Sequence, residues 1–151
     1  MSFINNKTLP DISSFKDKPA GVMLLDCFER VVGTPEEQGY FELVAYTESD
    51  THALLEKSTD GGTENERKTS YLIPVEAVQN AFDIISRYGM SDWNDRDDTV
   101  GICGMLFVCK FPLSDGSYVR VSSESMPDDG TAAFREVSGA LCAYCIEEYL
   151  K

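Results

Sequence analysis

Histidine is nearly absent from the sequence, since His52 is the only one in the chain. Serine- and cysteine-based catalysts most often need a histidine as general base, so only one residue could serve. His52 follows a polar segment, Thr47–Thr51, and no G-x-S-x-G elbow occurs. The sequence therefore predicts a surface histidine and no enzyme activity. An enzyme that relies on carboxylates or cysteine is the remaining catalytic alternative.

The sequence also lacks any run of about 18 apolar residues, the length that a membrane-spanning helix requires. Its first residues, MSFINNKTLPDISSFKDKPAG, do not show the charged and then apolar pattern of an export signal. The number of cysteines, five, is odd, which favours reduced thiols over a disulfide framework. We therefore expect a soluble cytoplasmic protein without membrane association.

Motifs for phosphate or metal binding are missing as well. Neither Gly61-Gly62 nor Gly101–Gly104 extends to a phosphate-binding loop. The acidic loop Asp92–Asp98 departs from the spacing of a calcium-binding loop, so a solvated loop is the simpler interpretation. The CxxC motif Cys142–Cys145 could be a redox pair or half of a zinc site. Because it falls near the end of a predicted helix and no second CxxC exists, it predicts buried apolar thiols. We expect no cofactor and no metal.

What the sequence has in excess is acid. Residues 1–31 carry four acids and four bases, so the whole net charge of −13 lies in residues 32–151. The densest stretch, residues 36–66, holds nine acids against Lys57 alone. A field of this sign repels nucleic acid and anionic membranes and attracts basic protein surfaces.

Periodic patterns predict an α+β domain of element order βββαββα. A helix with a buried stripe is expected between Pro74 and Gly89, and a second one over residues 131–150. The polar segment 59–68 predicts a loop or hairpin tip, after which the chain re-extends at residues 70–73, a candidate second hairpin arm against residues 52–58. This order favours an antiparallel sheet of about five strands with both helices on one face. Residues 1–20 form a polar lead-in and residues 21–151 the domain. The expected strands span residues 22–31, 40–48, 52–58, 101–112 and 118–124.

The segment from Ser70 to Leu150 carries a recognisable series of features. These are Tyr71–Glu76, Tyr88-Gly89-Met90 with Trp93, the hairpin from Phe111 through Asp115-Gly116-Ser117, and Met126-Pro127 before the final helix. The series resembles a small βββαββα domain of uncharacterised proteins from Gram-positive gut bacteria. The resemblance implies a fold and no activity.

The placement of the acids predicts a partner-binding surface on the second and third strands and their loops. Tyr40 and Tyr46 share a strand face with Glu42 and Glu48, which is typical of a contact surface or of an ordinary half-exposed sheet face. We expect a non-catalytic protein-binding module for a basic protein, with no direct contact to nucleic acid. Its sharpest form is a nucleic-acid mimic, an anti-CRISPR-like inhibitor from a phage or mobile element. A scaffold or assembly domain, monomeric or homodimeric, is the alternative. The candidate partner-binding residues are Tyr40, Glu42, Tyr46, Glu48, Asp50, Glu56, Asp60, Glu64, Glu66, Asp95, Asp97 and Asp98.

Overall fold

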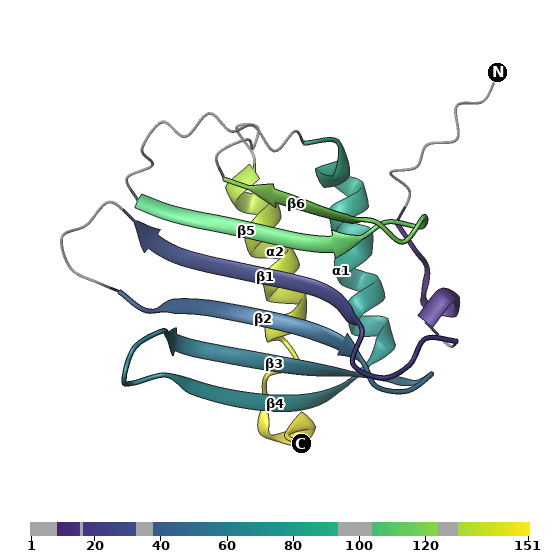
Figure 1. Cartoon of the computed structure of the whole chain (residues 1–151), viewed down its shortest axis with the longest axis horizontal. Helices are drawn as coiled ribbons and strands as arrows, with labels where there is room; N and C mark the ends of the chain where they lie inside the picture. The colour runs from purple at the N-terminus through teal and green to yellow at the C-terminus, as the bar shows by residue number, and fades with distance from the viewer. Residues whose placement is uncertain (1–8, 16, 33–37, 94–103, 124–129) are drawn as a thin grey trace.

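The computed structural model describes residues 9–15, 17–32, 38–93, 104–123 and 130–151. A six-stranded antiparallel sheet, in the order β4-β3-β2-β1-β5-β6, is covered on one face by two helices (Figure 1). The predicted α+β class and antiparallel sheet are confirmed, but the sheet has six strands where about five were expected. The strands are β1 Met23–Val32, β2 Tyr40–Thr47, β3 His52–Gly61, β4 Arg67–Pro74, β5 Gly104–Pro112 and β6 Tyr118–Ser122.

The sixth strand, β4, contains residues 70–73, where the chain was expected to re-extend after a loop or hairpin tip. Strand β3 continues to Gly61, β4 begins at Arg67, and Thr59 pairs with Arg67 just before the turn. Positive φ angles at Asp60 and Gly62 (52° and 77°) reverse the chain. The hairpin tip is confirmed, and both strands extend into the polar segment because a backbone ladder needs no apolar side chains where the hairpin extends beyond the core.

Helix α1 spans Val75–Arg87 and ends as predicted, with Gly89 in the left-handed conformation at φ 64°. Met90 opens a short 3₁₀ segment, η2 Met90–Asp92, and is fully buried. Trp93 then packs edge-on against Phe134 of the second helix, with ring centroids 5.7 Å apart.

Helix α2 spans Gly130–Cys142, so the expected helix over residues 131–150 is wrong at its C-terminal end. The chain turns after Cys142 and forms the 3₁₀ segment η3, Glu147–Tyr149. Leu150 then makes an antiparallel bridge to Tyr71 of β4, and the Lys151 amide donates to the Ser70 carbonyl at 3.0 Å. This pairing requires extended backbone at the C-terminus. The helical spacing of apolar residues continues beyond Cys142, but it does not produce a longer helix.

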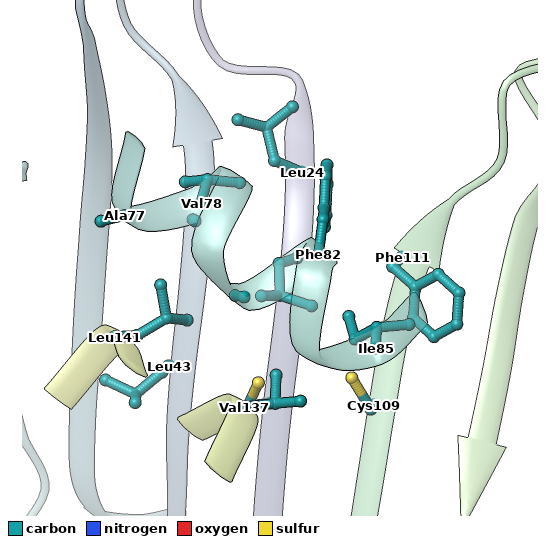
Figure 2. Close-up of a cluster of buried hydrophobic side chains, with 14 of the residues drawn as sticks. Leu24, Leu43, Ala77, Val78, Phe82, Ile85, Cys109, Phe111, Val137 and Leu141 are labelled. Atoms are coloured by element: carbon teal, nitrogen blue, oxygen red, sulfur yellow. The ribbon is translucent and has the colours of Figure 1, made fainter. Parts of the chain in front are cut away.

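The hydrophobic core lies between the helices and one face of the sheet (Figure 2). The expected stripes of both helices are buried there, apart from Tyr144 and Cys145, which lie beyond α2 and are only partly buried. Part of the N-terminal lead-in also joins this core. The 3₁₀ segment η1, Ile12–Phe15, brings the Phe15 ring to 5.9 Å from that of Phe82. Among the described residues, no helix is long and apolar enough to cross a membrane.

Candidate interaction site on the open face of the sheet

The sheet face opposite α1 and α2 carries no described helix, and we call it the open face (Figure 1). Strand pairing places a row of six residues across it, one from each strand, about 4.8 Å apart. A neighbouring row lies two residues along each strand. The first row is Ser70, Glu56, Val44, Asp26, Lys110 and Arg120, and the second is Lys68, Ser58, Glu42, Phe28, Val108 and Ser122.

Apolar and aromatic side chains surround the charged residues of these rows. Tyr46, Leu54 and Leu72 pair across β2, β3 and β4, and each is partly buried. The ring of Phe28 lies 5.1 Å from that of Tyr40. The open face is thus a mixed surface, as protein contact surfaces are.

Asp26 and Glu42 form a carboxyl pair on neighbouring strands of the open face. Burial, a hydrogen bond shared with Glu42 and the negative charge of Glu42 together raise the pKa of Asp26 to about 7. The buried Oδ1 atom of Asp26 has no hydrogen-bond partner among the described residues. Two ionised carboxylates on neighbouring strands repel each other, which favours the protonated form of Asp26.

Charges of opposite sign divide the open face. Burial, and then the charges of Glu56 and of the carboxyl pair, raise the pKa of the Tyr46 hydroxyl. Lys110 pairs directly with Asp26 across β5 and β1, and its charge opposes the rise in the pKa of Asp26. Arg120 lies beyond Lys110 on β6. Within these two rows the face is therefore acidic over β1–β3 and basic over β5 and β6, and Lys68 of β4 adds one base at the opposite edge.

The structure brings only some of the predicted partner-binding residues together. Tyr40, Glu42, Tyr46 and Glu56 lie on the open face. Glu48 and Asp50 lie in the β2–β3 turn, whereas Asp60, Glu64 and Glu66 lie at the β3–β4 hairpin tip, at the opposite end of β3. A strand of this length spans about 30 Å, so the two loops do not form one patch. Asp95, Asp97 and Asp98 lie outside the described residues.

The hairpin tip is connected to the open face through Tyr40. Its hydroxyl donates to Oε1 of Glu66 at 3.4 Å, and its ring covers Gly61. A Cβ atom at Gly61 would lie only 2.3 Å from that ring. The absence of a side chain at Gly61 thus allows Tyr40 to lie over the hairpin.

Replacing Gly61 with alanine is therefore expected to push the Tyr40 ring away from the hairpin and from Phe28. We expect a loss of about 1 kcal/mol in unfolding free energy, measured by urea denaturation. Gly139→Ala is the control, because a Cβ there meets no atom within 4 Å in the exposed part of α2. That change should stabilise the protein slightly. Equal effects of the two substitutions would contradict the packing of Tyr40 on Gly61.

Asp26 and Lys110 were missed in the candidate set deduced from the sequence. The acid-rich stretch that suggested the candidates begins after residue 35, while Asp26 lies in a segment whose charges balance. The available signal was a single carboxylate between Leu25 and Cys27 within an apolar strand. Its pairing with Glu42 depends on strand register, which residue counts do not reveal.

Within the described ranges, the histidine, cysteine and acidic side chains do not form a metal-ligand cluster. Nδ1 of His52 lies 2.8 Å from the Thr51 hydroxyl, in the β2–β3 turn. No group of three or more histidine, cysteine, aspartate or glutamate residues could hold a metal there. A polar hollow of about 520 Å³ lies at the hairpin tip, and a hollow of mixed lining, about 500 Å³, lies between the N-terminal segment and the β5–β6 turn.

The four described cysteines divide into two pairs in different surroundings. Cys27 and Cys109 are directly opposite on β1 and β5 and are buried. A hydrogen bond with Cys109 and burial raise the pKa of Cys27 well above its usual range. Cys142 is exposed and Cys145 only partly buried, so the prediction of buried thiols is wrong for this pair. The reason is that α2 ends at Cys142 and no longer directs both side chains into the core.

Similarity to known proteins does not assign a function to this chain. No protein family, curated protein or solved structure matches it. The functional argument therefore depends on the geometry of the open face.

Proposed function

We propose that the protein is a non-catalytic binding module that docks a basic protein surface on the acidic half of its open face. The observation that carries the proposal is the set of carboxyl groups on adjacent strands, Asp26, Glu42 and Glu56, set among partly buried aromatic and aliphatic side chains. Such a face offers a partner both apolar area and charge complementarity.

The sheet holds these carboxyl groups at fixed positions, unlike a disordered acidic tail. Asp26 and Glu56 lie two strands apart in one row, which corresponds to about 10 Å. A fixed array of negative charge can compete with a nucleic acid for a basic groove, because the phosphate backbone supplies most of the non-specific binding energy of such grooves. An inhibitor that mimics nucleic acid is thus the sharpest form of the proposal.

The carboxyl pair gives this docking a proton dependence. A lysine or arginine of the partner, placed beside Asp26 and Glu42, would lower the raised pKa of Asp26 and release its proton. Binding should therefore be tighter at pH 8 than at pH 6, and it should weaken with salt as expected for charge pairing.

A second copy of the chain is the second candidate occupant of the open face. The observation that favours it is the division of charge, with Asp26, Glu42 and Glu56 on one side and Lys110 and Arg120 on the other. A two-fold axis could place the acidic half of one copy over the basic half of the other. Light scattering at low and high salt distinguishes this homodimer from a monomeric binder.

The test compares two double variants that remove the same charge from different faces. Glu42→Gln with Glu56→Gln changes the open face, and Glu76→Gln with Glu148→Gln changes exposed positions in α1 and η3. Partners are captured by crosslinking, identified, purified and titrated with each variant. We expect the open-face variant to bind about tenfold more weakly, with a smaller salt dependence, and the control to bind within twofold of the original. The proposal is contradicted if no captured partner binds the open-face variant more weakly than the control variant.

A further inference from the structure

The turn that follows α2 holds two cysteines in close proximity. The Cys145 amide donates to the Cys142 carbonyl at 2.9 Å, which closes a four-residue turn. A turn of this kind brings its first and fourth Cα atoms within about 7 Å, a separation that overlaps the range a disulfide requires. The two side chains share a hydrogen bond, and the Cys145 thiol also lies 3.8 Å from the Leu141 carbonyl.

The two thiols of this turn differ in accessibility and in acidity. Cys142 is exposed, whereas Cys145 is partly covered. The hydrogen bond from Cys145, followed by the positive charge of Lys57, lowers the pKa of Cys142 to about 7, although burial and Glu29 oppose it. The same hydrogen bond raises the pKa of the Cys145 thiol above its usual value. The partial negative charge at a helix C-terminus disfavours a thiolate. The side chains of Cys145 and Lys57 therefore lower the pKa of Cys142 in opposition to the helix dipole.

We propose that Cys142 and Cys145 form a thiol–disulfide exchange site that reacts with small organic disulfides of the glutathione type. Cys142 is the attacking thiol, because it is the exposed member of the pair, and Cys145 is the resolving thiol. The site lies at the end of α2, on the helix side of the sheet, so it is independent of the open face.

The exchange has two steps in which atoms and electrons balance. The Cys142 thiolate attacks one sulfur of the small disulfide, forms a bond to it and releases the other half as a thiolate. The Cys145 thiol then loses its proton to the released thiolate and attacks Sγ of Cys142, which expels the second half. Two protein thiols are oxidised to one disulfide, and one small disulfide is reduced to two thiols.

The experiment uses the full chain with Cys103→Ser, equilibrated with mixtures of reduced and oxidised glutathione. Acid quenching, alkylation and peptide mass spectrometry then follow each cysteine. We expect the peptide that contains Cys142 and Cys145 to lose two hydrogen atoms, while Cys27 and Cys109 stay reduced in the same sample. In Cys145→Ser, glutathione should stay attached to Cys142, because no resolving thiol remains.

A kinetic measurement provides the second criterion. The lowered pKa of Cys142 favours its thiolate near neutral pH. We therefore expect Cys142 to be alkylated about tenfold faster than Cys145 in the folded protein, and faster than Cys142 in urea. The proposal is overturned if the pair stays reduced in every mixture, or if Cys142 reacts no faster folded than in urea. Neither result bears on partner binding at the open face.

Discussion

Replacing Phe82 with alanine is expected to cost about 4 kcal/mol of unfolding free energy, the largest effect of any single change considered for this protein. Phe82 is 1% exposed and lies in the centre of α1, where it faces the sheet (Figure 2). The substitution removes most of a buried aromatic side chain and leaves a cavity that the surrounding residues cannot fill completely. It also removes the edge-to-face contact with Phe15.

Phe28→Ala is the matched control, since it removes the same side chain from the open face. Phe28 is only partly buried and packs on Tyr40, so we expect a cost of about 1–2 kcal/mol. Urea denaturation at one pH measures both variants. A cost for Phe28→Ala as large as that for Phe82→Ala would mean that the open face is covered in solution.

Replacing Asp26 with asparagine is expected to stabilise the protein by about 1–2 kcal/mol at pH 8. The folded protein holds the pKa of Asp26 at about 7, whereas the ordinary value is 3.8. Above pH 7 this carboxyl ionises in the folded protein, which lowers the free energy of unfolding. The asparagine side chain does not ionise, so the variant avoids this loss. The expected gain is below the full value of such a shift, because water partly screens a half-exposed group.

The pH dependence identifies the cause of this stabilisation. Between pH 4 and pH 7 the folded protein binds a proton at Asp26 that the unfolded chain has lost, so the stability of the original protein falls as pH rises through this window. The advantage of Asp26→Asn should be largest above pH 7 and should shrink toward pH 4. Urea denaturation at pH 5 and pH 8 measures the difference.

Asp115→Asn provides the control of opposite sign. Hydrogen bonds from the Ser117 hydroxyl and amide lower the pKa of Asp115. Its contribution to stability is present above the ordinary pKa and is lost as the pH falls, so the asparagine variant should gain nothing at pH 8. An equal gain from both substitutions would indicate a general relief of net negative charge instead of a property of the carboxyl pair.

The parts of the fold that local patterns specify could be predicted from the sequence. Helix α1 follows from its apolar stripe and Gly89, and the faces of β2 follow from the alternation of Phe41, Leu43 and Ala45 with Glu42, Val44 and Tyr46. The end of α2 could not be predicted, because pairing of Leu150 with Tyr71 is a long-range contact that overrides helical periodicity.

The candidate site could be predicted only in part for the same reason. The sequence places Tyr40, Glu42 and Tyr46 on one face, but the contribution of Asp26 and Lys110 depends on which strands flank β1. The β1–β5 pairing joins residues more than seventy positions apart, such as Val32 and Gly104. No local sequence pattern indicates that β5 lies beside β1. The carboxyl pair and its proximity to Lys110 were therefore found only in the structure.

The position of β1 between β2 and β5 also has a consequence for the order of folding. The strands β2, β3 and β4 form one unit of consecutive hairpins, and β5 and β6 form another. Only β1 joins the two units, and its pairing with β5 closes a chain loop that contains three strands and α1. Closing a loop of that length is entropically costly before its contacts form, so we expect the β1–β5 junction to be completed late. The carboxyl pair requires only β1 and β2 and can form early. Lys110 comes next to it only when β1 pairs with β5, late in folding.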